Sequence, residues 1–573
     1  MIDFKKFDKT FPTPNARADA IFKHLASLKD KRHPFLALWD VENRLFLPRR
    51  YDLLRQDHLR HDRPGQQYGA QIYDGHPANA ANKFALGILS YMVSRSTPWM
   101  RLVPAKRILL ENDDVKKYFQ NATTQVLWSF NQSNFYGESV WFTKDATVTG
   151  TAYNVAEENL ETGAVNYQTV HPGDCYLEDD WSGKAAIFIR FPVMLTAMAA
   201  VDKFGADSLP AKVVQDARGI NNGNPFNKSK YMMAVYRNNA EVKGSIRPED
   251  MPYKVFWILV GDQPRALTMV QESGWQWFTL TWRMGKESGQ SYGTSLAADA
   301  LTEGLQVNKL GQKTMEMAHM AVNPPTVQPE TLRRLLNLRA GGRTFTPKGT
   351  SPDSVREVFG NNKWPIGDAE MERIHNSLDD KFFIRFFEML TSRDVPANIT
   401  AFQIQQMVSE KAILMGAMVG AFEQEYLKNA IDIQFAHEEK AGRLPDPPDI
   451  LFEDGQGQTN LDIAYEGPLA KMQTTLLESK PILDGLGLMQ AIGNIWPNSL
   501  IKVNEMKLIE DAGISVGMSQ DLFKDDREVV EIMTQVNAQD AREQELLEAE
   551  SAAKQIPALT GAVDETSILA NAG

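Results

Sequence analysis

One long helical pattern, from Ser295 to about Val322, constrains the fold more than any other stretch of the sequence. Ser295 is a residue type that caps helix N-termini, and Asn323-Pro324-Pro325 ends the pattern. At 1.5 Å per residue such a helix is roughly 40 Å long. Because interior glycine costs a helix about 1 kcal/mol relative to alanine, we expect a neighbouring element to approach closely at Gly304 and Gly311. The segment alone favours a core helix between two domains over a helix shared between identical subunits.

A basic insert and a returning helix follow this pattern. The insert over residues 324–367 is rich in proline, and positions 325–365 carry 7 Lys and Arg against 3 Asp and Glu. An apolar helical pattern resumes over 368–390. A polar break at 391–398 separates it from a further long helix that reaches about Ala441, with Gly416 and Gly420 as expected bend points.

The composition is that of a globular protein large enough for two to four domains. The chain has 573 residues, of which 43% are hydrophobic and 23% are charged. Its single cysteine, Cys175, excludes an internal disulfide framework and a multi-cysteine zinc site, and it fits assembly in a reducing cytosol. We expect no signal peptide and no membrane-spanning helix, because the sequence has neither an apolar N-terminal region nor a run of about 18 apolar residues.

Charge is distributed unevenly along the chain. The net charge of −12 argues against a protein coated with positive charge for general nucleic-acid binding. Residues 1–70 nevertheless hold 14 Lys and Arg against 9 Asp and Glu, whereas residues 504–573 hold 5 against 15. Such separation is typical of solvated faces, and also of surfaces that meet different partners.

The remaining patterns predict a mixed α+β protein. Helices are predicted over residues 14–63 with an interruption at Pro34, over 78–92, over 111–136 and over 473–554. Strands are predicted at 100–103 and 460–466, in a β-rich stretch over 137–192 that begins with a strand at 141–148, and in a meander over 231–282.

No motif for catalysis or metal binding stands out. The phosphate-loop spacing is missing, and the nearest segment, GGRTFTPKGTS at 341–351, lacks the strand–loop–helix setting. The acidic cluster Glu178-Asp179-Asp180 is interpreted as a solvated hairpin turn rather than a metal site. The aromatics Trp275, Trp277, Phe278 and Trp282 are interpreted as one face of a core rather than a base-stacking platform. The residues therefore predict a non-enzymatic protein with no catalytic residue, metal or cofactor.

Five blocks spread through the chain carry a resemblance to a known family. They are IYDGHPANAANKFALGILSYMVSRSTPWMRL at 72–102, SNFYGESVWFTKDATVTGTAYNVAEE at 133–158, YGTSLAADALTEGLQVNKL at 292–310, NPP at 323–325 and NITAFQIQQMVSEKAILMGAMVGAFEQEYL at 398–427. In this order they resemble the portal, or head-to-tail connector, proteins of short-tailed, podovirus-type bacteriophages. The resemblance covers roughly residues 15–475 and includes no catalytic signature.

The resemblance implies a ring, usually a dodecamer, at one vertex of the viral capsid. A separate terminase motor would pump DNA through its axial channel, and the DNA would later leave by the same route. The implied fold has a β-rich wing (1–285 and 399–475), a stem with a descending helix (286–323) and an ascending helix (368–390), a small α/β clip (324–367), a channel loop (391–398), and a helical crown or barrel with an acidic tail (476–573).

Site residues follow from this framework. The candidates for weak phosphate contacts in the channel are Lys309, Lys313 and Arg393, and an outward solvated face stays an open alternative for each lysine. The candidates for partner docking in the clip are Arg333, Arg334, Arg339, Arg343, Lys348, Arg356 and Lys363. Gly304 and Gly311 are assigned to packing of stem helices between neighbouring subunits, so we expect Gly311→Leu to weaken ring assembly and leave the wing folded.

The resemblance also implies partners and a location. The partners are further copies of the chain, the terminase large subunit, a tail adaptor protein, capsid and scaffolding proteins, and double-stranded DNA bound without sequence preference; no membrane is involved. The protein would assemble in the host cytoplasm and reside at the portal vertex of the virion. Two other functions stay open: another structural virion component, such as a tail or capsid subunit, and a DNA-acting packaging enzyme.

Overall fold

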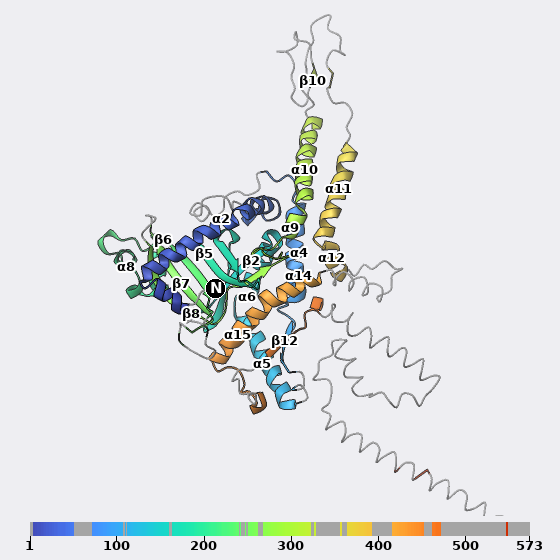
Figure 1. The fold of residues 1–573 in the computed structure, drawn as a ribbon. Coiled ribbons are helices and arrows are strands. Elements are labelled where there is room, and N and C mark those ends of the chain that lie inside the picture. The colour runs from blue at the N-terminus through green and yellow to red at the C-terminus, as the bar shows by residue number, and fades with distance from the viewer. Residues whose placement is uncertain are drawn as a thin grey trace, which may run out of the picture. The chain divides into compact units, whose positions relative to one another are not determined.

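The computed structural model contains a sheet-bearing body and a projecting pair of helices, all within the first of two compact units (Figure 1). The first unit covers residues 1–473 and the second covers residues 474–573. The structure describes residues 4–50, 71–106, 109, 112–159, 163–239, 241, 247, 250–261, 267–322, 326–327, 356–357, 364–391, 415–451 and 461–470, together with 542, 546 and 547.

A five-stranded antiparallel sheet organises one end of the body. Its strands, in spatial order, are β4 (Cys175–Asp179), β5 (Ala185–Thr196), β6 (Lys228–Arg237), β7 (Tyr253–Val260) and β8 (Leu267–Trp275). Alternate residues of β6 enter different cores: Met232 and Ala234 pack on one side of the sheet, and Tyr231 and Met233 on the other. The predicted meander is confirmed for β6, β7 and β8, whereas the last strand of the predicted stretch, β9 (Leu280–Arg283), belongs to a different sheet.

Helix α2 (Pro14–Phe46) covers one face of this sheet and runs straight through Pro34. Ile21, Leu25 and Leu28 pack against the sheet ahead of the proline. Arg32 is 3% exposed and donates hydrogen bonds to the carbonyl oxygens of Gly173 (3.0 Å) and Cys175 (2.6 Å). The predicted interruption at Pro34 is wrong, because tertiary contacts on this stretch outweigh the loss of one backbone hydrogen bond.

Two short helices cover the opposite face of the sheet. Helices α7 (Ala197–Phe204) and α8 (Ala211–Arg218) contribute Ala200, Phe204 and Val213 to the core on that side. The other short helices of the body are α1 (Phe4–Thr10), η1 (Pro48–Arg50), η3 (Pro172–Asp174), η4 (Ala206–Ser208), η5 (Ile220–Asn222) and η9 (Asp449–Leu451).

A mostly helical region forms the rest of the body. Its helices are α4 (His76–Met92), α5 (Asp113–Gln132), α6 (Phe135–Thr149), α14 (Gly416–Ala421), the π-helix η8 (Phe422–Leu427) and α15 (Lys428–Lys440). A small sheet has the order β3 (Ala164–Val170), β2 (Thr151–Asn159), β9 (Leu280–Arg283). Strand β1 (Met100–Pro104) pairs with β12 (Leu461–Tyr465), which joins segments more than 350 residues apart.

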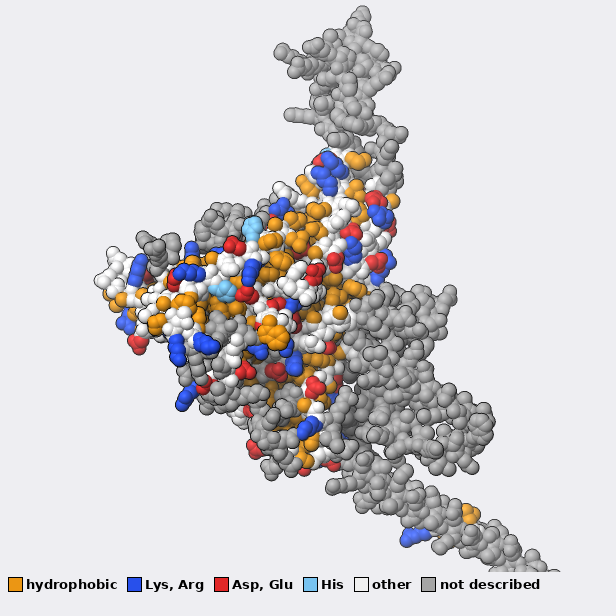
Figure 2. All heavy atoms as spheres, in the orientation of Figure 1, with side chains coloured by type: hydrophobic (Ala, Val, Ile, Leu, Met, Phe, Trp, Pro, Cys, Tyr) orange, Lys and Arg blue, Asp and Glu red, His pale blue; other side chains and the backbone are white. Residues whose placement is uncertain are grey.

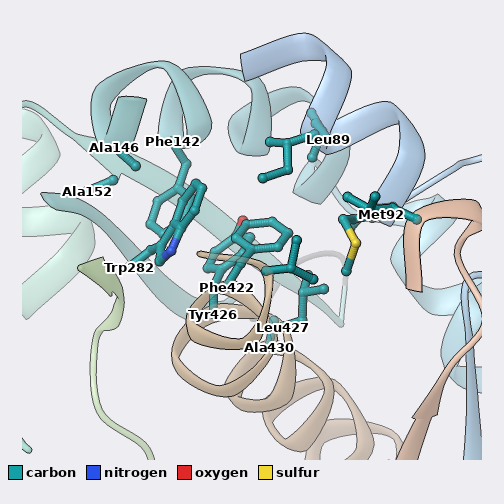
Figure 3. Packing of buried hydrophobic residues seen from close by; sticks show 14 of the residues in the cluster. Leu89, Met92, Phe142, Ala146, Ala152, Trp282, Phe422, Tyr426, Leu427 and Ala430 are labelled. Carbon is teal, nitrogen blue, oxygen red and sulfur yellow. The ribbon is translucent and has the colours of Figure 1, made fainter. Parts of the chain in front are cut away.

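An aromatic stack occupies the centre of this helical region. Figure 3 shows Phe142, Trp282, Phe422 and Tyr426 meeting from α6, β9 and the π-helix. The ring centroids of Phe142 and Tyr426 lie 3.9 Å apart, and those of Trp282 and Phe422 lie 4.7 Å apart. The Tyr426 hydroxyl is satisfied by the hydroxyl of Ser139 at 2.7 Å. Trp282 is therefore core, as the sequence predicts.

The strand predicted at 141–148 is wrong, because this stretch lies inside helix α6. Its aromatic and β-branched residues are typical of strands, but the hydroxyl groups find partners within the helix. Ser139 donates to the carbonyl of Phe135 at 2.7 Å, and Thr147 donates to the carbonyl of Thr143 at 2.7 Å. The buried positions Phe135, Ser139, Phe142 and Ala146 recur at helical spacing and face the aromatic stack.

The helix pair consists of α10 (Leu301–Val322) and α11 (Trp364–Lys381), which lie side by side and project away from the body (Figure 1). A short helix, α9 (Leu296–Asp299), precedes α10 and begins as predicted, since the Ser295 hydroxyl accepts a hydrogen bond from the amide of Ala298 at 2.8 Å. Helix α12 (Ile384–Thr391) follows α11 after a break at Phe383, whose φ is 55°.

Strands β10 (Thr326–Val327) and β11 (Arg356–Glu357) pair antiparallel within the insert. The other predictions for the insert, the channel loop at 391–398 and nearly all of the crown at 476–573 lie outside the described residues. No helix within the described residues combines the length and the apolar character that a membrane span requires.

Replacing Trp282 should be costly, and replacing Trp181 should not. Trp282 is fully buried, whereas Trp181 in the β4–β5 turn is 90% exposed. We expect Trp282→Ala to lower the free energy of unfolding by about 3–5 kcal/mol, because it leaves a large cavity. We expect Trp181→Ala to change it by less than about 0.5 kcal/mol. Chemical denaturation of both variants measures this, and equal losses would contradict the burial described here.

Candidate functional site

The helix pair has a buried inner face of small and apolar residues, which packs partly between the two helices and partly against the body. On α10, Gly304, Val307 and Gly311 are buried, and on α11 Ile374 and Leu378 are buried. The Thr314 hydroxyl lies 3.7 Å from the Met371 sulfur farther along the pair. This face is buried by contacts within the chain. The opposite face of α10, which we call its open face, has exposed side chains.

The open face of α10 carries two of the predicted channel residues. Lys309 and Lys313 are exposed one helical turn apart. The Lys309 ammonium donates to Gln312 Oε1 at 2.9 Å, and the Lys313 ammonium lies 2.7 Å from Glu316 Oε2. The hydrogen bond from Lys313 lowers the pKa of Glu316. Part of the positive charge on this face is therefore neutralised along the helix itself.

Apolar side chains are also exposed on α10. Leu305, Met315 and Met317 are 48%, 47% and 38% exposed. Figure 2 shows apolar side chains among charged ones over the helix pair. An exposed helix with this mixture has surface available for a further contact.

The two glycines of α10 have their close neighbours inside the same chain. A Cβ at Gly304 would lie 2.9 Å from the ring of Phe46, at the end of α2. A Cβ at Gly311 would lie 3.3 Å from the backbone oxygen of Tyr73. These neighbours within the chain account for the close approach expected at both glycines, and the predicted packing between neighbouring subunits stays a prediction. A leucine at Gly311 would displace the chain around Tyr73 within the same subunit.

Residues 71–76, which we name the strap, cross the helix pair. The amide of Tyr73 donates to Asn308 Oδ1 on α10 at 2.8 Å, and Asn308 Nδ2 donates back to the carbonyl of Gln71 at 3.1 Å. The strap therefore pairs with α10 through one asparagine side chain, beside the space that Gly311 leaves open.

The strap contacts α11 through two histidine–aspartate pairs. His375 Nε2 lies 2.8 Å from Asp74 Oδ2, and His76 Nε2 lies 2.9 Å from Asp379 Oδ1. The two imidazole rings stack on each other with centroids 4.1 Å apart. Sequence reasoning did not single out these four residues, because about 300 positions separate the partners in each pair.

The base of α10 is fastened by a second set of polar contacts. Lys381 at the end of α11 lies 2.5 Å from Glu303 Oε1 and donates to the carbonyl of Asp299 at 2.7 Å. Glu42 of α2 is 1% exposed beside this base. Burial raises the pKa of Glu42 to about 8; the Ser295 hydroxyl opposes this shift, and the charge of Asp299 adds to it.

The acidic cluster at 178–180 is engaged in ion pairs, which corrects the prediction that it is solvated; the predicted turn itself is present between β4 and β5. Glu178 pairs with His24 and Lys31, and Asp180 pairs with Arg237. Asp179 pairs with Arg283 at 2.7 Å and Lys286 at 2.6 Å, and Arg283 also pairs with Glu425 of the π-helix at 2.5 Å. Among the described residues no group of three or more His, Cys, Asp and Glu could hold a metal ion.

The other predicted site residues lie outside the part of the chain whose side chains are described. They are Arg393 of the channel loop and the clip residues Arg333, Arg334, Arg339, Arg343, Lys348, Arg356 and Lys363. Arg356 is placed only as a backbone position in β11.

Comparison with known proteins identifies matches that run along nearly the whole chain. A family model described as "Bacteriophage head to tail connecting protein" matches residues 18–523. The chain is similar to the "Portal protein" of Salmonella phage epsilon15, with 23% identity over 547 residues, which is 93% of this chain and 92% of the relative. It is also similar to the "Probable portal protein" of Bordetella phage BPP-1, with 23% identity over 514 residues and 89% of each chain covered. The resemblance drawn from the five sequence blocks is thereby confirmed.

The strap predicts a specific response to mutation. We expect His375→Ala to speed amide hydrogen exchange in residues 71–76 and in α11, because it removes one polar contact and the ring stack. Glu372→Ala removes an exposed side chain one helical turn away on α11, and it should leave the amide exchange rates unchanged. Hydrogen-exchange mass spectrometry separates the two, and equal exchange in both variants would show that the pairs do not hold the strap.

The buried carboxyl of Glu42 predicts a pH-dependent stability difference. Its pKa rises from 4.5 to about 8 on folding. Below about pH 4.5 it is protonated in both states, and between these values only the unfolded state loses the proton, so the stability contribution falls as pH rises. We expect Glu42→Gln to match the wild type at pH 4.5 and to exceed it at pH 8, by an amount on the order of 3 kcal/mol. Denaturation at both pH values measures the difference, and a pH-independent gap would contradict this assignment.

Proposed function

We propose that this chain, which belongs to the family of bacteriophage head to tail connecting proteins, forms the portal ring at one capsid vertex. DNA would enter the capsid through the axial channel of the ring during packaging and leave through it at ejection. The observation that carries the proposal is the family match over residues 18–523. It is supported by two relatives named as portal proteins, each matched over about nine-tenths of its length.

The projecting helix pair is the element that we assign to the channel wall. Its inner face is occupied within the chain, and its open face carries Lys309 and Lys313. Each phosphate contact adds sequence-independent affinity that weakens with salt. A few partly neutralised lysines in a chain of net charge −12 would guide DNA without gripping it. We propose the same weak contact for Arg393 in the channel loop.

The insert between the two helices is the proposed docking site for partners. Positions 325–365 carry a net positive charge. Within this stretch β10 pairs with β11. A basic surface of this kind favours the rate and orientation of docking onto acidic partner surfaces. The terminase large subunit and then a tail adaptor protein would use it in turn, through arginines and lysines between Arg333 and Lys363.

The remaining assignments follow the portal arrangement. We propose a dodecameric ring in which residues 1–285 and 399–475 form the wing, and residues 476–573 form the crown. Capsid and scaffolding proteins would contact the ring, which would assemble in the host cytoplasm and remain in the virion. The role is structural rather than enzymatic, with packaging energy supplied by the separate terminase.

Imaging of the purified chain tests this function against its alternative, another structural virion component. We expect negative-stain electron microscopy to show flanged rings with an axial hole. Head-to-tail contacts between identical subunits form a closed ring when the rotation from one subunit to the next adds up to a full turn. Such a ring has an axial hole, which is what the channel role requires. Sheets, fibres or only monomers at concentrations up to the micromolar range would overturn the proposal in favour of a tail or capsid subunit. Metal-dependent hydrolysis of ATP or DNA by the pure protein would favour a packaging enzyme.

A further inference from the structure

A cluster of positive side chains lies at the base of the helix pair, where sequence reasoning singled out no residue. The cluster comprises Arg49 and Arg50 of η1 and Lys144 of α6, with Trp141 in contact with Arg50 and Lys144; we name it the cationic cluster. The Arg50 guanidinium lies 5.2 Å from the centre of the Trp141 ring, and the Lys144 ammonium lies 5.1 Å from it. One aromatic ring therefore holds two cations close together.

The position of the cluster follows from the chain around it. η1 begins two residues after Phe46, whose ring meets Gly304 in the first turns of α10. Helix α6 contacts both α2 and α9, the short helix that leads into α10. The cluster is thus part of the junction between the body and the helix pair.

Counted over the described residues, the positive charge of the cluster exceeds the negative charge beside it. Among these residues Asp145 is the carboxylate that faces the cluster, buried and 3.3 Å from Arg50. Burial raises the pKa of Asp145 to about 6, against the opposing effect of Arg50 and Lys144. Within the described part of the chain, Asp145 thus faces both Arg50 and Lys144, and Arg49 is exposed to solvent.

The cations also repel one another. The pKa of Lys144 is lowered, first by its partial burial and then by the charge of Arg49, with Asp145 acting in the opposite direction. A bound anion would relieve this repulsion. Guanidinium and ammonium groups together bind phosphate oxygens well, the arginine through paired hydrogen bonds and the lysine as a point charge.

We propose that the cationic cluster binds a phosphate group of the duplex DNA backbone at the point where the helix pair meets the body. The inference rests on the proposed portal function, and it adds a contact site separate from Lys309 and Lys313 farther along α10. Arg49 and Lys144 supply the direct contacts. Arg50 is the positioning residue, because it already pairs with Asp145 and packs on Trp141.

The experiment measures binding of a fluorescent 30-base-pair duplex to assembled rings over a series of salt concentrations. Arg49→Ala with Lys144→Gln removes both direct contacts and leaves the Arg50–Asp145 pair intact. At 0.15 M salt we expect about a fivefold loss of affinity for each phosphate contact removed, with a shallower salt dependence. The matched control, Lys117→Ala with Lys184→Ala, removes the same charge from exposed positions on α5 and in the β4–β5 turn. The control should change the affinity for the duplex and its salt dependence much less.

Several outcomes would overturn the proposal. Unchanged affinity and salt dependence would do so, as would a loss no larger than that of the control. Arg49→Ala alone guards against misfolding, because this exposed side chain can be removed without opening the core. Sodium tripolyphosphate serves as a second probe. If it binds the cluster while the variants leave the affinity for the duplex unchanged, the site binds a small phosphate compound and not DNA. Failure of the wild type to form rings would count against the portal function, and this outcome is visible before any DNA is added.

Discussion

Close backbone approach at two glycines of α10 allows the helix pair and the body to pack as one unit. Phe46 occupies the space beside Gly304, and the strap occupies the space beside Gly311. A Cβ at Gly304 would press on the Phe46 ring at 2.9 Å, and a Cβ at Gly311 would lie 3.3 Å from the backbone oxygen of Tyr73, so a side chain at either position requires its neighbour to move. The close approach also brings Asn308 within hydrogen-bond distance of the strap and aligns His76 and His375 with their aspartates. The orientation of the helix pair is therefore set inside a single chain.

Buried and half-buried ion pairs hold the body that supports this junction. Arg283 links Asp179 at the end of β4 to Glu425 in the π-helix, and so joins the two sheet regions to the helical core. Such pairs contribute little net stability but disfavour other arrangements, since breaking one leaves an uncompensated charge. The carboxylates of Glu178, Asp179 and Asp180 are engaged in such ion pairs rather than in a metal site. Among the described residues near the helix pair, positive charge on Arg49, Lys144, Lys309 and Lys313 is partly neutralised, since Lys313 pairs with Glu316, and this suits the proposed passage of sliding DNA.

Sequence patterns predicted the elements with strong local signals. The Ser295 cap and the two strands at 100–103 and 460–466 could be predicted, because capping and alternation act within a few residues. The returning helix could be predicted as well, but its break at Phe383 could not. The pairing of those strands could not, since it joins β1 to β12 across the whole chain. Helix α6 was wrongly predicted as a strand because its hydroxyl groups satisfy themselves along the helix. Likewise, the strap and the cationic cluster arise from contacts between distant segments, which periodicity does not encode.

The central claim is that the helix pair, fixed to the body by the strap, forms the wall of a DNA channel. A three-dimensional reconstruction of the assembled ring by cryo-electron microscopy tests it most directly. We expect α10 beside the axial channel, with Lys309 and Lys313 on the channel surface and the strap still crossing α10 and α11 in every subunit. A ring whose axis is lined by the five-stranded sheet, with the open face of α10 pointing outward to solvent, would contradict it.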